Sequence, residues 1–514
     1  MNTSDWISRN VSKLLPATAL KQNKPLAAES IAVGAMNTVA PSDVAATSPK
    51  PAAPLIGAAA GQAAPRVPAR STQERLAGTL RRKEEALSPR ELRRMLAELQ
   101  AVVDNQVSEV EGGLRAKTLT HWYAKADPAQ RRDFWLLMSE QFTADPGTVK
   151  QAQARFAAAV GTPDEAAAEV QYRRATVSPR RRLLQRFSAF PEGIRFLVDL
   201  RADMLPQLKS DKRLQALDVE MEYMFSTWFD VGFLDLRRIS WDSPASLIEK
   251  LIKYEAVHDI KSWADMKNRL DSDRRCYGFF HPRLADEPLI FVEVALIGDM
   301  AASITPLLDE SADASDLSKA TTAIFYSISN TQTGLRGVSF GDSLIKRVVE
   351  TLKTEFPRLK TFATLSPIPG FRGWLGKHAT AMLERLPEKA RAELAQALAC
   401  EAVTATQLLA VADKPLALDA KSPVRQWLMQ CAAHYLAREM AGDQPLDPVA
   451  RFHLGNGARV ERLNWAGDPS PKGLKQSCGL MVNYLYDLKR LDKHREQLAN
   501  KKIPISSAIN DLKF

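Results

Sequence analysis

The stretch 323–375 reads AIFYSISNTQTGLRGVSFGDSLIKRVVETLKTEFPRLKTFATLSPIPGFRGWL, and it decides the fold of this chain. An apolar run at 323–329 leads into a polar loop, and a helical pattern follows over 343–356. A second apolar run at 361–365 stops at Ser366, just ahead of a Pro-Ile-Pro-Gly turn. This order of strand, loop, helix and strand predicts half of a coenzyme-binding site, because a helix N-terminus offers unpaired backbone N–H groups to an anion.

The loop 330–342 has the composition of a phosphate-binding segment, with three glycines and no proline. Glycines let the backbone approach a phosphate closely, so that its N–H groups point at the oxygens. Arg336 adds a guanidinium that can bind a phosphate through two hydrogen bonds. The loop has neither the Gly-Lys-Ser/Thr ending of a Walker A motif nor the glycine spacing of a dinucleotide fingerprint. The alternative is a glycine-rich connection that only turns the chain.

Ser366 and His453 are the candidate reactive side chains. The prolines after Ser366 would hold its hydroxyl at a strand end, although a serine there can also simply cap a turn. His453 precedes a Gly-Asn-Gly turn and a strand-like segment at 459–465. An imidazole suits proton transfer near neutral pH. His281, in a Phe-His-Pro sequence, is the rival histidine, and the residues alone do not bring Ser366 beside His453.

Composition divides the chain into three parts. Residues 1–72 form an N-terminal extension that is rich in Ala, Pro and Ser from residue 25, which predicts a linker or disordered tail. Residues 73–264 have a helical pattern, which predicts an all-helical domain. The role of that domain would be packing or oligomerisation. Helix starts are indicated by Ser88-Pro89, Asp127-Pro128 and Ser178-Pro179.

Residues 265–514 mix strands with helices and form the predicted catalytic domain. Strand-like runs at 277–280 and 289–296 predict two strands around a turn at 286–288. Further along, we expect a helical insertion at about 387–440 and a helix at 477–488. The fold class predicted for the whole chain is therefore α+β, with an all-helical N-terminal domain before a mixed α/β domain.

Charge and cysteine content limit the classes of function. The formal net charge is +10, which would suit nucleic acid, a membrane surface or an anionic small molecule. Acids and bases intermix along the chain without an aromatic and basic stripe, so we expect no nucleic-acid partner. No apolar stretch approaches the roughly 20 residues that span a bilayer, so no membrane partner is expected either. Four scattered cysteines suit a reducing compartment and offer no metal cluster or disulfide framework.

The first 24 residues carry several basic side chains against a single acid. They resemble a mitochondrial transit peptide weakly. The preferred interpretation is a disordered extension of a bacterial-type, cytoplasmic protein.

Several blocks of sequence, in the same order, resemble the malonyl-CoA decarboxylase family. The likeness runs through about residues 73–488, and blocks in a common order are more specific than any single motif. They are 323–329, the loop that ends at Gly341, 344–349, 355–357, 365–371, 452–454, 456–458, 464–465 and 477–486.

The resemblance implies a fold and a set of site residues. The second domain would be related to the GCN5-related acetyltransferases (GNAT), in which one strand splays from its neighbour and the next loop holds the coenzyme A pyrophosphate. Ser366 and His453 match the family's catalytic pair. The substrate-binding positions that the resemblance implies are Ser327, Arg336, Gly337, Val338, Ser339, Phe340, Gly341, Asp342 and Tyr486. Vertebrate members carry a glutamate where this chain has Ser339, so another group would have to replace that carboxylate.

The reaction implied is conversion of malonyl-CoA to acetyl-CoA and carbon dioxide, a lyase reaction. Breaking the bond between Cα and the carboxylate leaves an electron pair that needs hydrogen-bond donors at the thioester oxygen and an acid for Cα. The thioester is its own electron sink, so no metal or organic cofactor is expected beyond the coenzyme A of the substrate. Malonate catabolism and control of malonyl-CoA in fatty-acid metabolism both fit. The resemblance also implies a homotetramer.

Two rival functions remain open at this point. An acyl-CoA-dependent N-acyltransferase would use the same fold with an amine acceptor. A helical scaffold or basic nucleic-acid binder is the non-enzymatic alternative. Whether Ser366 acts as a hydrogen-bond donor or forms a covalent acyl intermediate is also open.

Overall fold

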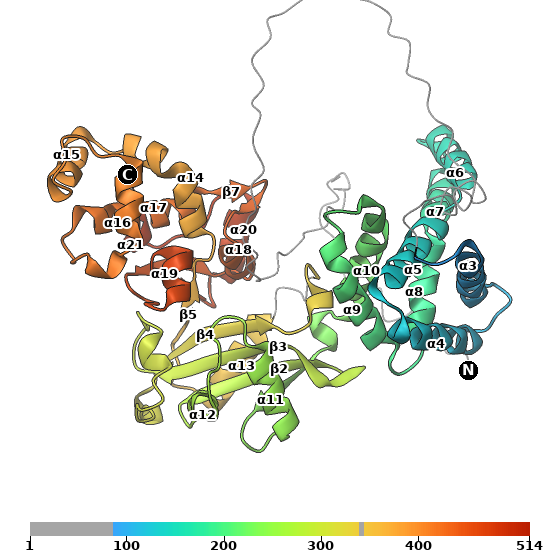
Figure 1. Cartoon of the computed structure of the whole chain (residues 1–514), viewed down its shortest axis with the longest axis horizontal. Coiled ribbons are helices and arrows are strands. Elements are labelled where there is room, and N and C mark those ends of the chain that lie inside the picture. Colours follow the sequence, from blue (N-terminus) through green and yellow to red (C-terminus); the bar gives the residue numbers. More distant parts are fainter. Residues whose placement is uncertain (1–85, 339–343, 514) are drawn as a thin grey trace, which may run out of the picture. The chain divides into compact units, whose positions relative to one another are not determined.

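A computed structural model describes residues 86–338 and 344–513. In these ranges a helical region comes first and a mixed sheet with further helices follows (Figure 1). The helices of the first region are α3 (Pro89–Val103), α4 (Glu109–Lys125), α5 (Pro128–Gln141), α6 (Pro146–Ala159), α7 (Glu165–Thr176), α8 (Pro179–Ser188), α9 (Gly193–Met204) and α10 (Gln215–Trp228). This order confirms the predicted α+β class.

Helices α3, α5 and α8 begin where the sequence predicts. The Ser88 hydroxyl accepts a backbone N–H in the first turn of α3, and the carboxylate of Asp127 does the same for α5, where Gln130 completes a capping box. The Ser178 hydroxyl caps α8 in the same manner. These caps satisfy N–H groups that a helix leaves without intrahelical partners, and a proline in the first turn has no N–H to lose.

Within the described ranges, eight strands form one sheet in the order β1-β2-β3-β4-β5-β10-β6, and β9 also pairs with β10. The strands are β1 (Asp235–Ile239), β2 (Arg274–His281), β3 (Leu284–Ile297), β4 (Thr322–Asn330), β5 (Thr361–Thr364), β6 (Ser366–Pro367), β9 (Arg459–Asn464) and β10 (Met481–Leu485). A small separate pair joins β7 (Met440–Ala441) to β8 (Gln444–Pro445). Strand β1 comes from a segment ahead of residue 265, where the sequence analysis begins the second domain.

Strands β4 and β5 separate from each other, which is the feature expected from the acetyltransferase resemblance. They are the parallel pair of an otherwise antiparallel sheet, and their register runs only from Thr322 and Thr361 to Phe325 and Thr364. Strand β4 then continues beside β3, whereas the chain after β5 pairs with β10 through Ser366. The sheet therefore opens a gap between the C-terminal ends of two neighbouring strands.

Further helices belong to the same part of the chain as this sheet. They are α11 (Ala245–Tyr254), α12 (Trp263–Arg269), α13 (Leu344–Glu355), α14 (Phe371–Glu384), α15 (Glu388–Ala397), α16 (Ala405–Ala412), α17 (Pro423–Arg438), α18 (Pro448–Gly455), α19 (Pro471–Ser477), α20 (Leu491–Ala499) and α21 (Ser507–Asn510). Helices α15 to α17 confirm the predicted helical insertion. Across the described ranges, no helix has the length and apolar character needed to cross a membrane.

Two local predictions are wrong. The segment 477–488 contains strand β10 in place of a helix, because Cys478 and Gly479 both adopt positive φ angles and end α19. A strand buried on both faces has a near-continuous apolar pattern, which periodicity does not separate from a helix. The turn between β2 and β3 lies at 282–283 and not at 286–288, because Pro288 is accommodated at an irregular position of the β2–β3 ladder.

Candidate active site

Ser366 and His453 lie beside each other although 87 positions separate them in the sequence. Ser366 starts β6, at the point where β4 and β5 separate, and His453 lies in the last turn of α18. The distance between Ser366 Oγ and His453 Nε2 is 3.3 Å. Both residues are buried, at 5% and 2% exposure. The structure thus brings together the two residues that the sequence alone does not connect.

His453 is held from its other side by two tyrosines of the β10 segment. Its Nδ1 lies 2.8 Å from the hydroxyl of Tyr486, and its ring stacks on Tyr484 at a centroid distance of 4.7 Å. Burial lowers the pKa of His453 to about 3, so the ring is neutral at pH 7 in the free protein. Burial raises the pKa of Tyr486, which keeps its phenol protonated.

Thr364 is a neighbour of the pair that sequence reasoning missed. Its hydroxyl accepts a hydrogen bond from Ser366 Oγ at 2.8 Å and another from the backbone N–H of Tyr484 at 3.1 Å. Thr364 and Ser366 are two residues apart in an extended segment, so their side chains lie on the same face. That alternation is the sequence signal that could have identified Thr364.

Asp447 sets the start of α18 and therefore the position of His453. Its carboxylate accepts the backbone N–H groups of Val449 and Ala450 at 2.9 and 3.0 Å, and it also accepts the hydroxyl of Tyr435 at 3.2 Å. Complete burial raises its pKa to about 6. The Asp447-Pro448 pair has the same form as the predicted helix start at Asp127, so the sequence could have revealed it.

Ser327 belongs to a second buried group, on β4. Its hydroxyl donates to both carboxylate oxygens of Glu255, at 2.8 and 2.9 Å, and Ser329 donates to the same carboxylate at 3.3 Å. The backbone N–H groups of Val257 and His258 bind Glu255 as well. In the described residues no hydrogen bond joins Ser327 to Ser366 or His453. Glu255 was not anticipated, because it follows a helix far from β4 in the sequence.

The start of the predicted coenzyme loop lies against the helical region. Arg336 has an exposed side chain, Gly337 adopts a φ of +84°, and Val338 is buried. A positive φ is accessible to glycine without strain. The remaining predicted positions, Ser339, Phe340, Gly341 and Asp342, lie outside the described residues.

A pocket of about 530 Å³ lies between the end of β4 and the chain at β6, next to Ser366 and His453, which do not themselves line it. Ser329 of β4 and Pro367 of β6 line it, as does Val449, one helical turn before His453. Lys377 and Lys472 supply positive charge to its wall. The other lining residues are Ala256, Val257, Ile328, Pro369, Gly370, Gly373, Trp374, His378, Tyr435, Leu446, Pro448 and Gln476.

The rival histidine, His281, is a packed residue of β2. Its ring contacts Phe229, which directly follows α10, at a centroid distance of 4.9 Å, and its Nδ1 accepts the backbone N–H of Arg283. Burial lowers its pKa. Among the residues with described positions, no group of three His, Cys, Asp or Glu side chains could hold a metal ion.

Both regions of the chain match known family models. Residues 142–229 match the malonyl-CoA decarboxylase N-terminal domain, and residues 232–513 match the malonyl-CoA decarboxylase C-terminal domain. The mitochondrial malonyl-CoA decarboxylase of Anser anser anser is 37% identical over 393 residues, which cover 73% of this chain and 78% of that protein. The mitochondrial enzyme of Mus musculus is 37% identical over 413 residues, with 75% and 82% covered.

Solved structures agree with these matches. The crystal structure of malonyl-CoA decarboxylase from Rhodopseudomonas palustris has a TM-score of 0.71 and 41% identity, covering 82% of this chain and 99% of that chain. The structure from Agrobacterium vitis has a TM-score of 0.72 and 38% identity, covering 82% and 100%. The fold and these matches define an enzyme of the carboxy-lyase class. The chain belongs to the malonyl-CoA decarboxylase family.

Proposed function

We propose that this protein converts malonyl-CoA to acetyl-CoA and carbon dioxide in the pocket beside Ser366 and His453. Membership of the family supports the reaction. The single observation that carries the site is the contact of 3.3 Å between Ser366 Oγ and His453 Nε2, located where β4 and β5 separate. In the acetyltransferase-like fold, a gap of this kind is where an acyl-CoA thioester would enter.

We propose that His453 carries its proton on Nε2, on the basis of the hydrogen bonds around its ring. Tyr486 is protonated, and its hydroxyl donates to Nδ1 in the arrangement that we propose. Nε2 then carries the proton and donates to Ser366 Oγ, whose own hydroxyl donates to Thr364. In this arrangement each hydroxyl between Tyr486 and Thr364 has a defined acceptor. The His453 N–H and the Ser366 O–H are thus engaged with each other and with Thr364 in the free protein, and we propose that they turn to the substrate when it binds.

The reaction needs these donors at two moments. When the bond between Cα and the carboxylate breaks, carbon dioxide leaves and the electron pair moves onto the thioester oxygen. A donor from Ser366 or His453 would stabilise the enolate oxygen. Cα then takes one proton, for which His453 is the proposed acid, and the thioester forms again as acetyl-CoA. The thioester accepts the electron pair itself, so we propose that no cofactor takes part.

The anionic substrate would also change the state of His453. In the free protein burial lowers the pKa of His453 to about 3. A carboxylate placed beside the ring favours the protonated form and opposes the effect of burial. We propose that substrate binding raises the pKa of His453, so that the ring is protonated in the complex and can give a proton to Cα. Lys377 and Lys472 in the pocket wall favour the same anion.

The test is turnover of malonyl-CoA with no acceptor present, following acetyl-CoA and carbon dioxide together. The proposal predicts equal amounts of the two products. The alternative, an acyl-CoA-dependent N-acyltransferase, requires an amine acceptor. A folded protein that binds coenzyme A and releases no carbon dioxide would contradict decarboxylation and favour that alternative.

We further propose a cytoplasmic homotetramer assembled through the helical region. This proposal rests on the family resemblance, and the mitochondrial relatives leave a second compartment to be tested. Sedimentation equilibrium should give four times the mass of one chain. A single monomeric species at micromolar concentration would contradict the tetramer.

A further inference from the structure

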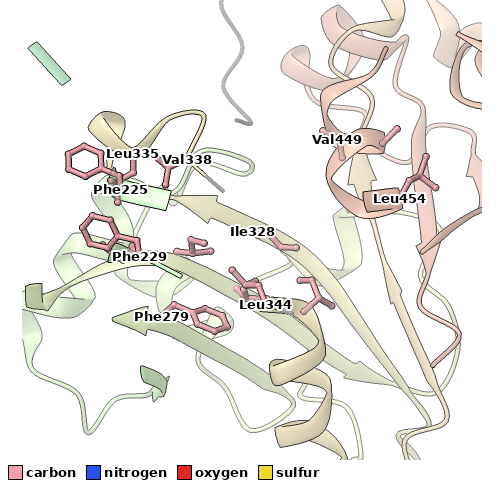
Figure 2. Packing of buried hydrophobic residues seen from close by; sticks show 14 of the residues in the cluster. Phe225, Phe229, Phe279, Ile328, Leu335, Val338, Leu344, Val449 and Leu454 are labelled. Carbon is pink, nitrogen blue, oxygen red and sulfur yellow. The ribbon is translucent and has the colours of Figure 1, made fainter. Parts of the chain in front are cut away.

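The first half of the predicted coenzyme loop, residues 331–338, is packed on the helical region. A Cβ atom added to Gly334 would lie only 1.8 Å from the backbone oxygen of Val198 on α9, so the two backbones are in close contact. Figure 2 shows Leu335 and Val338 next to Phe225 of α10 and Phe229, which directly follows α10, and all four residues belong to one buried hydrophobic cluster. The position of this loop therefore depends on helices outside the sheet.

Arg201 of α9 makes the polar part of this contact. Its side chain is 2% exposed, and its Nη1 donates to the backbone oxygens of Gly334 and Arg336 at 2.9 and 2.8 Å. Its Nε donates to the carboxylate of Asp218 on α10 at 2.8 Å. The planar guanidinium holds these partners in a fixed geometry, which a lysine could not reproduce. Arg201 thus fixes the loop backbone on both sides of Leu335.

Arg201 also balances negative charge beneath the loop. Glu222 lies 3.8 Å from Arg201 Nη2, and an added Cβ on Gly337 would come within 3.9 Å of the Glu222 carboxyl group. Burial raises the pKa of Glu222. Without the guanidinium, the carboxylates of Asp218 and Glu222 would lie uncompensated next to a loop proposed to bind phosphate. Like charges at that distance weaken anion binding.

We propose that Arg201 is a positioning residue for coenzyme A, through which the helical region holds residues 331–338 of the predicted coenzyme loop in place. It acts through the backbone of residues 334–336 and through the charge of Glu222, without contact to the reacting atoms. The inference rests on the proposed function, because it takes residues 331–338 as part of the coenzyme A site.

The test compares Arg201→Met with Arg180→Met. Arg180 is also a buried arginine of the helical region, but among the described residues its side chain donates to the carbonyl oxygens of Met138, Ser139 and Ala216, which lie within that region. For Arg201→Met we expect KM for malonyl-CoA and Kd for coenzyme A to rise about tenfold or more, with kcat within about twofold. Arg180→Met should lower the melting temperature and leave both constants unchanged.

A charge variant separates positioning from general packing. Adding Glu222→Gln to Arg201→Met removes a repulsive charge, so the double variant should recover part of the coenzyme A affinity. A structural role alone would predict no recovery. Arg195→Ala is the milder variant if Arg201→Met does not fold, because Arg195 Nη1 donates to Gln332 Oε1 at 2.6 Å and lies at the surface of the contact. It should raise Kd about threefold.

Unchanged KM and Kd in a folded Arg201→Met protein would overturn the inference, as would an unchanged Kd in Arg195→Ala when the first variant does not fold. Coenzyme A binding by calorimetry does not depend on turnover. If wild type binds coenzyme A without releasing carbon dioxide, the proposed decarboxylation fails while the Kd values still test Arg201. If wild type does not bind coenzyme A, both proposals fail.

Discussion

At the scale of single residues, the tyrosine behind His453 has a role that can be separated from packing. Tyr486 contacts His453 Nδ1 at 2.8 Å, so its loss should free the ring to change tautomer or orientation. We expect Tyr486→Phe to lower kcat on the order of ten- to a hundredfold. Steady-state kinetics with malonyl-CoA measure the effect.

Tyr484→Phe is the matched control for that change. The hydroxyl of Tyr484 is buried without a hydrogen-bond partner among the described residues, while its ring stacks on His453. Removing this hydroxyl keeps the ring, so kcat should stay within about twofold of wild type. Equal effects of the two phenylalanine variants would contradict a specific role for the Tyr486 hydroxyl.

Glu255 is the second residue whose role can be isolated. It accepts the hydroxyls of Ser327 and Ser329 and two backbone N–H groups, which is more than one amide oxygen can replace. Glu255→Gln turns an amide N–H₂ toward donors and should lower kcat/KM about tenfold. Glu249→Gln, at an exposed carboxylate on α11, is the control and should have little effect. A Glu255→Gln protein with wild-type kcat/KM would show that the hydrogen bonds between Glu255 and Ser327 do not contribute to the reaction.

At the scale of elements, the turn from β6 into α14 depends on Gly370. A Cβ at this position would lie 2.2 Å from the hydroxyl oxygen of Tyr435, which also binds Asp447 at the start of α18. Gly370→Ala should therefore displace the turn that follows Ser366, destabilise the protein by about 1–3 kcal/mol and reduce activity. Urea unfolding and kinetics measure both effects.

Gly376, further along α14, provides the comparison. The nearest atom to an added Cβ there is 3.6 Å away, on the side chain of Arg372. Gly376→Ala should stabilise the protein by about 0.5–1 kcal/mol, because alanine loses less backbone entropy in a helix. If Gly370→Ala were as stable as Gly376→Ala, the contact with Tyr435 would not constrain the turn.

The elements also show how much of the fold and site the sequence could predict. Capped starts such as Ser88-Pro89, and the strand that ends before Ser366, depend on local spacing, which is readable from one chain. Strand β10 is buried on both faces, so its pattern lacks the alternation that marks a strand. The contacts of Glu255 with Ser327, and of Ser366 with His453, join distant segments, and only the folded sheet brings these side chains together.

At the scale of the whole molecule, buried histidines should make stability depend on pH. Burial is the main cause that lowers the pKa of His258 from 6.5 to about 3, with a further contribution from Arg269 and Lys472. Between these values the unfolded chain binds a proton that the folded protein does not, so stability falls as the pH falls from about 6.5 toward 3. Each such histidine lowers the free energy of unfolding by about 1.4 kcal/mol for every pH unit of acidification in that range. His453 acts with the same sign.

The raised pKa of Asp447 changes the pH dependence of stability in the opposite direction. Comparing wild type with His258→Gln therefore isolates the contribution of His258. We expect the unfolding free energy of His258→Gln to fall less steeply than that of wild type between pH 6 and pH 4.5, by about 1.4 kcal/mol per unit. Urea unfolding at several pH values provides the measurement, with His121→Gln on the exposed face of α4 as control. Parallel curves for wild type and His258→Gln would contradict the prediction.

The central claim concerns how Ser366 and His453 act together on malonyl-CoA. The most direct measurement is the rate of carbon dioxide release without an acceptor, for wild type, Ser366→Ala and His453→Gln, with coenzyme A binding measured in parallel. The account predicts turnover by wild type and losses on the order of a hundredfold or more in both variants, at nearly unchanged affinity for coenzyme A. Wild-type rates in either folded variant would contradict it.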